Sequence, residues 1–277
     1  MVSASHEALK WTMRAGYAAR GVIYILVGSL AFWAAFSPSQ PEGTKDALSQ
    51  LRAAPLGIAM LSFIAIGLFA YMIWRIIAGV ADVEEHGHGA KGIFARAGQI
   101  VTGVIHGGIG LWVMALAIGS ARDGQNSQIA WIQALLDLPG GRPIVATGAL
   151  VLAGAGIYYV KKGAFSEYQD HLASAPLLSR IDPLLKYGLI IYGGLLVLVA
   201  VSFGFAAWNG EAAQSGGLGQ ALQSLRDLAF GRVLLGFAGL GLIAFALYNL
   251  AEAVWRIVPT IDGPDVETMR RAAQRLT

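Results

Sequence analysis

Hydrophobic residues along this chain gather into long blocks separated by short polar stretches. A helix rises about 1.5 Å per residue, so about 20 apolar residues cross the roughly 30 Å hydrocarbon core of a bilayer. Six blocks have about that length, at residues 17–36, 57–80, 98–119, 143–160, 187–208 and 233–258. Backbone groups in lipid must be satisfied within the segment, so the blocks predict helices and not β-barrel strands. The predicted fold class is all-α, a polytopic membrane protein with six transmembrane helices.

The amino-acid composition agrees with a membrane protein and excludes several other classes. Of the 277 residues, 56% are hydrophobic, 13% are charged and none is cysteine. A soluble domain carries about 25% charged residues. The chain therefore lacks the charge of a water-facing surface, and its composition excludes disordered, disulfide-stapled and thiolate-metal proteins.

A short motif recurs where the first, third and fifth blocks begin. A basic residue is followed by glycine two positions later and by a second glycine five positions after that. The three copies are Arg14, Gly16 and Gly21; Arg96, Gly98 and Gly103; and Lys186, Gly188 and Gly193. Inside the even blocks, glycine precedes an aromatic residue by four positions: Gly67 and Tyr71, Gly154 and Tyr158, Gly241 and Phe245. We expect the six entry-motif glycines to pack helices closely, because small residues let backbones approach in lipid.

These motifs define three units of helix, short amphipathic outer helix and helix. The short segments lie at 47–52, 131–136 and 221–226. Two spans per unit insert every copy in the same direction, so the repeats are parallel. We place them at about 9–91, 92–178 and 179–262 of a single transmembrane domain, 1–277, with a cytoplasmic tail at 263–277. A pseudo-threefold bundle about the membrane normal and a serpentine six-helix bundle both remain open.

The distribution of Lys and Arg predicts the orientation in the membrane. The side with both termini carries fourteen of these residues and the opposite side six, so the positive-inside rule places both termini in the cytoplasm. The first block could be read as a cleavable signal peptide, but the repeat requires that it stay. The net charge of +3 follows from the inner excess and needs no nucleic-acid partner.

Residues 14–24, with weaker copies from Arg96 and Lys186, resemble a family of bacterial integral membrane proteins of unknown function, defined by three tandem two-helix repeats. The likeness covers about residues 9–264. At the position of Tyr24 in the first copy, the second copy has His106 and the third has Leu196. The resemblance implies the bacterial inner membrane and a six-span topology, and it carries over no activity, substrate or catalytic residue.

His106 is the deepest polar residue of the third block, about 12 Å from its start. A histidine there can line a pore or relay protons, or it can be a packed core residue satisfied by a hydrogen bond. Thr102 lies four residues earlier on the same helix face. We favour the packed core residue.

A second polar stripe, Asn249, Glu252 and Arg256, lies near the end of the sixth block. Glu252 and Arg256 are four residues apart in the favourable order for a helix pair. Arg20 is a cation at a similar predicted depth in the first block. We therefore expect a salt bridge between Arg20 and Glu252 that joins the first and sixth helices, rather than an ion site.

The loop after the second block contains Glu84, Glu85, His86 and His88, which are residue types that bind metals. Their spacing matches no zinc motif and glycines interrupt them. We expect a solvated cytoplasmic turn and no metal.

The chain has no phosphate loop, no His-Glu-x-x-His and no Gly-x-Ser-x-Gly, so no catalytic residue and no cofactor is predicted. We favour a non-catalytic structural or accessory membrane component whose partner is the lipid bilayer. A small-solute or ion permease with a path lined by His106 and Glu252 is the alternative. An intramembrane enzyme acting on a lipid or a quinone is the second alternative. Association with another membrane protein or with a second copy stays open.

Overall fold

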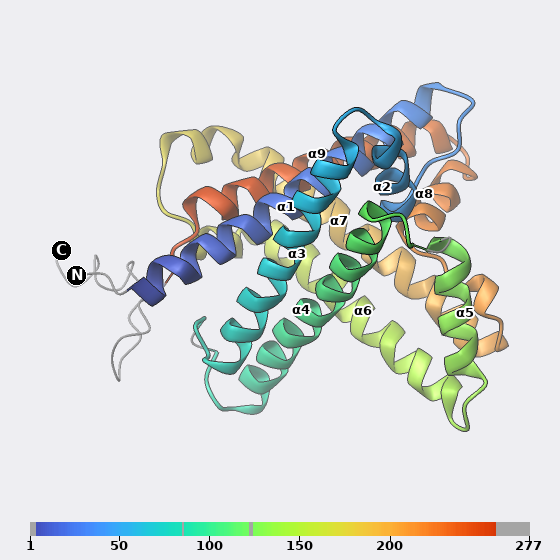
Figure 1. Ribbon diagram of the computed structural model, residues 1–277, viewed down its shortest axis with the longest axis horizontal. Helices are drawn as coiled ribbons and strands as arrows, with labels where there is room; N and C mark the ends of the chain where they lie inside the picture. The colour runs from blue at the N-terminus through green and yellow to red at the C-terminus, as the bar shows by residue number, and fades with distance from the viewer. Residues whose placement is uncertain (1–3, 85, 122–123, 259–277) are drawn as a thin grey trace.

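The computed structural model describes residues 4–84, 86–121 and 124–258, so the predicted tail at 263–277 lies outside the described residues. This part of the chain folds into nine α-helices and two 3-10 helices (Figure 1). The elements are α1 (Ala4–Phe36), α2 (Thr44–Ala53), α3 (Gly57–Val80), α4 (Ala90–Ala117), α5 (Gly124–Leu136), α6 (Gly141–Ala164), η1 (Glu167–His171), α7 (Pro176–Asn209), η2 (Ala212–Gln214), α8 (Leu218–Arg226) and α9 (Gly231–Trp255).

Six of these helices, α1, α3, α4, α6, α7 and α9, are long and apolar enough to cross a membrane. The predicted all-α polytopic fold is confirmed. The first helix of each predicted repeat begins two or more turns before its apolar block, at Ala4, Ala90 and Pro176. The added turns include charged residues such as Lys10 and Lys91, because a helix can continue past the lipid into water.

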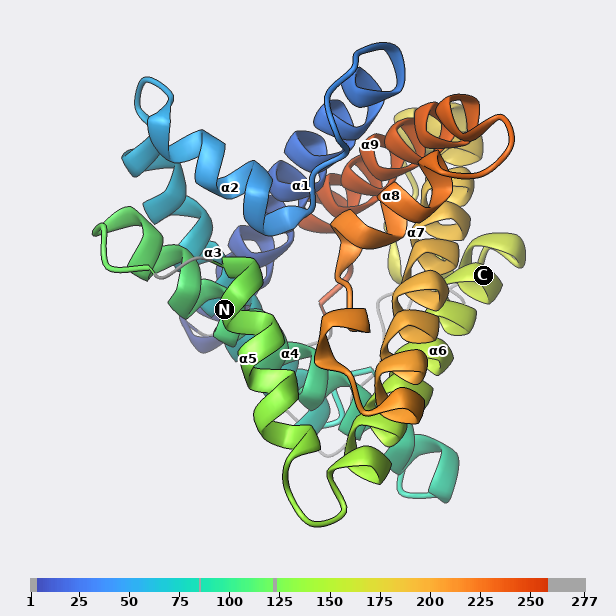
Figure 2. The ribbon, with the colours of Figure 1, turned by 90° about the vertical axis from the view of Figure 1, so that its right-hand side faces the viewer.

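The six long helices pack as three pairs, each joining two different repeats. The closest pairs are α1 with α9, α3 with α4, and α6 with α7. Viewed from the side of α2, α5 and α8, the pairs stand around a common axis (Figure 2). Within the first and third repeats, α1 also packs on α3 and α7 on α9. The two helices of the second repeat, α4 and α6, make no comparable contact. The arrangement is therefore a pseudo-threefold ring with one side open.

Glycines allow the long helices to approach closely where the pairs cross. A Cβ on Gly28 of α1 would lie 2.8 Å from the carbonyl oxygen of Gly239 on α9. The equivalent position of the second repeat, Gly110 on α4, faces Ala65 and Leu68 on α3. Such backbone contact is how helices associate in lipid, where no hydrophobic force between helices is available.

A tight turn precedes the second helix of every repeat. Leu56, Gly140 and Phe230 have positive φ angles of 61°, 81° and 60° and are each followed by glycine. A Cβ on the following glycine would lie 1.9 Å from a carbonyl oxygen of the preceding helix in all three turns. Only glycine fits such a close approach, so the turn fixes where the short helix meets the long one.

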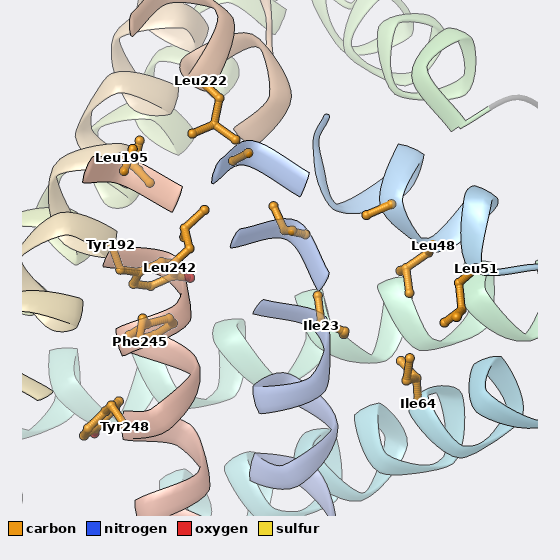
Figure 3. Close-up of a cluster of buried hydrophobic side chains, with 14 of the residues drawn as sticks. Ile23, Leu48, Leu51, Ile64, Tyr192, Leu195, Leu222, Leu242, Phe245 and Tyr248 are labelled. Atoms are coloured by element: carbon orange, nitrogen blue, oxygen red, sulfur yellow. The ribbon is translucent and has the colours of Figure 1, made fainter. Parts of the chain in front are cut away.

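The main buried apolar cluster lies between the first and third repeats and under two of the short helices (Figure 3). Leu48 of α2 and Leu222 of α8 are fully buried against the bundle. The matching residue of α5, Ile132, is only partly buried. We use "terminal face" below for the end of the bundle that carries Ala4 and Val258, opposite the face formed by α2, α5 and α8.

Candidate functional site

Glu252 on α9 is the centre of a buried polar cluster near the terminal face. Its carboxylate accepts hydrogen bonds from the guanidinium of Arg256, one turn later, and from the hydroxyl of Tyr248, one turn earlier. Lys162 on α6 has its Nζ 3.9 Å from the same carboxylate and donates to the Tyr248 hydroxyl at 2.9 Å. The helix itself places Glu252 and Arg256 together, and Lys162 extends the contact from the third repeat to the second.

The loop after α3 completes this cluster through Glu84. The Glu84 carboxylate pairs with Arg256 and lies 3.7 Å from a guanidinium nitrogen of Arg75, while His86 Nε2 is 3.4 Å from its other oxygen. Burial alone would raise the pKa of Glu84, but Arg256, the His86 hydrogen bond and Arg75 hold it well below its usual range. The prediction of a solvated turn is wrong for Glu84, because the loop folds back onto the end of α9. No group of metal-binding residues occurs in the described ranges.

Other contacts hold the end of α9 in place. The backbone N–H of Ile257 donates to the carbonyl oxygen of His171 at 2.9 Å. The guanidinium of Arg256 lies over the rings of Tyr17 and Trp74, at 5.5 and 5.9 Å from their centroids. The Glu252 cluster, defined as Arg75, Glu84, Lys162, Tyr248, Glu252 and Arg256, therefore ties α3, α6 and α9 together against α1.

Arg20 is the centre of a second buried cluster, at the midpoint of α1. Its side chain is 2% exposed and its Nη1 donates to the hydroxyl of Tyr71 on α3 at 2.8 Å. The guanidinium carbon lies 4.8 Å from the ring centroid of Tyr71, 5.6 Å from that of Phe245 and 5.8 Å from that of Tyr24. A desolvated cation over an aromatic face gains about 2 kcal/mol. The rings thus stabilise a charge that has no carboxylate beside it among the described residues.

Further aromatic residues surround Arg20, and Figure 3 shows Tyr192 next to Phe245. Tyr24 and Tyr192 share a hydrogen bond between their hydroxyls at 2.9 Å, and Tyr192 stacks on Phe245 with 3.8 Å between ring centroids. Tyr159 packs edge-on against Tyr192 at 5.0 Å. Each long helix contributes to this Arg20 cage, which comprises Arg20 and Tyr24 (α1), Tyr71 (α3), His106 (α4), Tyr159 (α6), Tyr192 (α7) and Phe245 (α9).

The predicted salt bridge between Arg20 and Glu252 is wrong. The helices α1 and α9 run antiparallel, and Gly21 lies against Leu250. Arg20 is therefore about one turn deeper than Glu252, and their charged groups meet different partners. Two guanidinium nitrogens of Arg20, Nε and Nη2, are buried and have no hydrogen-bond partner in the part of the chain that the structure describes.

The two remaining predicted polar residues bond mainly to their own helices. His106 is partly buried in the Arg20 cage, where its Nδ1 hydrogen bonds the Thr102 carbonyl at 2.8 Å and its ring lies 4.8 Å from that of Tyr71. The carbonyl can only accept, so Nδ1 carries the hydrogen. Asn249 is fully buried and its Nδ2 donates to the Phe245 carbonyl at 2.7 Å. The Asn249 Oδ1 has no partner within the described residues.

The six predicted packing glycines divide into two groups. A Cβ on five of them would lie within 3.0 Å of another helix: Gly16 at 2.6 Å from Tyr71, Gly21 at 2.8 Å from Leu250, Gly103 at 3.0 Å from Arg75, Gly188 at 2.3 Å from Phe245 and Gly193 at 2.5 Å from Gly156. Gly98 on α4 has nothing within 4 Å at that point.

Sequence reasoning missed several residues of both clusters. A signal for part of the Glu252 cluster does exist, because Arg75, Lys162 and Asn249 occupy one equivalent position of the three even-numbered spans. Polar residues recurring at one register inside apolar helices indicate a shared polar layer. Two residues of the Arg20 cage, Tyr71 and Phe245, also recur at one register, but Tyr159 and Tyr192 are not equivalent in the repeats and carry no such signal.

Comparison with known proteins agrees with this three-part architecture. A family model described as Domain of Unknown Function (DUF1206) matches the chain at residues 15–82, 97–166 and 187–256. The "Uncharacterized protein YxxB" of Bacillus subtilis (strain 168) is 26% identical over 247 residues, which cover 88% of this chain and 90% of that protein. No solved structure matches the chain. Each family match spans the two long helices of one repeat, α1 and α3, α4 and α6, or α7 and α9, and the chain therefore belongs to the DUF1206 family, as three tandem copies of its two-helix unit.

Proposed function

We propose that this protein is a non-catalytic integral membrane component with a structural or accessory role. The observation that carries the proposal is the pairing of buried charges in the Glu252 cluster. Glu252 and Glu84 both meet Arg256, and Lys162 reaches Glu252 as well. These groups hold helices of different repeats together.

The energetics of buried charge support this assignment. A charge in lipid costs several kcal/mol unless it is paired, so membrane proteins place such groups against partners or along a water-filled path. Glu252 is fully buried and its carboxylate oxygens are taken by Arg256 and Tyr248. A carboxylate held in this way stabilises the bundle, whereas a transport site needs one that can exchange its partners for a solute.

The permease alternative places His106 and Glu252 on one path. His106 contacts Tyr71 and Thr102 in the Arg20 cage, while Glu252 lies behind Arg256 and Tyr248. The enzyme alternative needs an acid and a base facing one substrate, and these two residues have separate surroundings. Both alternatives are therefore less well supported than a structural role.

Flux through reconstituted vesicles tests the proposal against the permease. We expect vesicles with the purified protein to pass protons, potassium and chloride no faster than empty vesicles. The Glu252→Gln variant should unfold at a lower temperature in detergent. A protein-dependent flux that His106→Leu abolishes without loss of folded protein would refute the structural role.

The plasma-membrane location and cytoplasmic termini form a separate part of the proposal, supported by the fourteen to six distribution of Lys and Arg. The chain has no cysteine, so single cysteines report sidedness directly. Ser39 and His88 are exposed on opposite faces of the bundle. An impermeant maleimide should label Ser39→Cys in intact cells and His88→Cys only after the cells are permeabilised. The reverse pattern would invert the proposed topology.

A further inference from the structure

The second repeat is open at positions where the first and third repeats are closed. Gly16 packs on Tyr71 and Gly188 on Phe245, and these pairs are equivalent in the repeat. The corresponding pair of the second repeat is Gly98 and Tyr158. Gly98 faces open space, and Tyr158 is 50% exposed, against 1% for Tyr71 and 0% for Phe245.

A second set of equivalent positions repeats this difference. Ile23 and Leu195 are 5% and 3% exposed, whereas their counterpart Ile105 is 54% exposed. Gly67 contacts Ala19 and Gly241 contacts Ile191, but their counterpart Gly154 has nothing within 4 Å. We call this surface the repeat-2 seam, lined by Gly98, Val101 and Ile105 on α4 and by Val151, Gly154 and Tyr158 on α6.

The surface of the seam is apolar, and polar residues lie behind it, on the side of Arg20. Val101, Ile105 and Val151 are all exposed. Next to Ile105, His106 turns into the Arg20 cage, and next to Tyr158, Tyr159 does the same from α6. Both residues are only partly buried. Arg20 is therefore separated from the seam by individual side chains and not by a packed helix pair.

The free edge of Arg20 matches an oxyanion. In a guanidinium, the Nε and Nη2 hydrogens point to the same side and form a fork that binds two oxygens of a carboxylate or phosphate. Nη1 is the nitrogen that bonds Tyr71, so the fork is the part left without a partner. The Tyr159 hydroxyl lies close to the guanidinium but outside hydrogen-bond geometry, so it is the polar group nearest to the fork. Glu252, the carboxylate predicted to pair with Arg20, is committed to Arg256.

We propose that the repeat-2 seam binds a long-chain fatty acid from the bilayer, with its hydrocarbon chain between α4 and α6 and its carboxylate on the Nε and Nη2 edge of Arg20. Apolar walls suit the chain, and an uncompensated buried cation suits an anion. A carboxylate, rather than a bulkier phospholipid head, fits a cation that is only 2% exposed. The inference is independent of the structural role proposed above.

Native mass spectrometry of the purified full-length protein in detergent tests this binding. The probe is oleate, and oleyl alcohol is the matched ligand with the same chain and no charge. We expect a single oleate adduct that survives activation, and about tenfold less adduct with oleyl alcohol. Equal retention of the two ligands would overturn the proposal. So would retention of dioleoylphosphatidylglycerol in preference to oleate, or a dimer in place of the adduct.

Three variants connect the adduct to the seam. Arg20→Gln removes the fork, and we expect it to lower oleate retention about tenfold. Gly154→Leu fills the seam and leaves Arg20 unchanged, so it tests the site even if Arg20→Gln fails to fold. The control Gly194→Leu adds the same side chain to α7 at an exposed position with nothing within 4 Å. Retention lost in Gly154→Leu and kept in Gly194→Leu supports the proposal, and retention kept in both overturns it.

Discussion

Adding one methyl group at equivalent glycines of the second and third repeats should have opposite effects on stability. In Gly188→Ala the new Cβ would lie 2.3 Å from the backbone nitrogen of Phe245 on α9. Backbone cannot rotate away as a side chain can, so α7 and α9 must separate. Overpacking typically costs about 1–3 kcal/mol, and we expect a clash with backbone to cost about 3 kcal/mol. In Gly98→Ala the new Cβ meets nothing within 4 Å.

The Gly98→Ala variant should be neutral or more stable by up to about 1 kcal/mol, because alanine is the better helix former. The two variants should therefore differ by about 3 to 4 kcal/mol, or about 10 °C in melting temperature for a chain of this size. Thermal unfolding in one detergent, followed by circular dichroism, measures the difference. If Gly98→Ala destabilises the protein as much as Gly188→Ala, the second repeat is closed in solution and the argument for the seam fails.

Three further predictions follow from the two clusters and the seam. Glu252→Gln should cost about 3 kcal/mol, because it removes the buried carboxylate that faces both Lys162 and Arg256; Glu7→Gln, in an exposed pair, should cost under about 0.5 kcal/mol in the same unfolding assay. Cysteines at Val101 and Gly154 should not form a disulfide under mild oxidation, as judged by gel shift. Glu84 should stabilise the fold fully above its ordinary pKa of 4.5 and progressively less as the pH falls below it. The melting temperature should therefore fall with pH in this range, and Glu84→Gln should remove that slope.

Matched controls sharpen the last two tests. Cysteines at Ala19 and Gly67, the equivalent pair of the first repeat, lie in contact and should cross-link. Rapid cross-linking of both pairs would contradict an open seam. For the pH test, the depressed pKa of Glu84 means that the unfolded chain binds the extra proton, so acid destabilises the fold. Burial lowers the pKa of His171, so this residue also contributes less stability in acid. Its contribution begins to fall as the pH drops below the ordinary histidine pKa of 6.5, above the Glu84 step, so the two steps are distinguishable. A Glu84→Gln variant with an unchanged slope below pH 4.5 would contradict the assignment.

The helices and their repetition could be predicted from the sequence because both are local properties. Apolar length indicates a membrane span, and the motif at Arg14, Arg96 and Lys186 marks each repeat. The depth of a side chain is different, because it depends on how neighbouring helices are aligned. Gly21 lies against Leu250, so Arg20 is about one turn deeper than Glu252. That difference was enough to predict the wrong partner for Glu252.

The contacts of the Glu252 cluster could not be predicted for a related reason. Glu84 lies in a loop whose composition is that of a solvated turn, and only the return of that loop to Arg256 buries it. Lys162 looks like the basic end of a membrane span, yet its ammonium group reaches inward to Tyr248. Long side chains at helix ends can point to water or to the core, and the choice depends on neighbours that the sequence does not place.

The position of Arg20 also explains why a threefold ring would not be symmetric here. The residues equivalent to Arg20 are Thr102 in the second repeat and Tyr192 in the third. Three guanidiniums in one low-dielectric cage would repel one another strongly, so the cage can hold one cation surrounded by neutral groups. The first and third repeats lie directly against that cation through Tyr24, Tyr71 and Phe245. The second repeat supplies His106 and Tyr159 from two helices that do not pack on each other, so the symmetry of the ring is broken on that side.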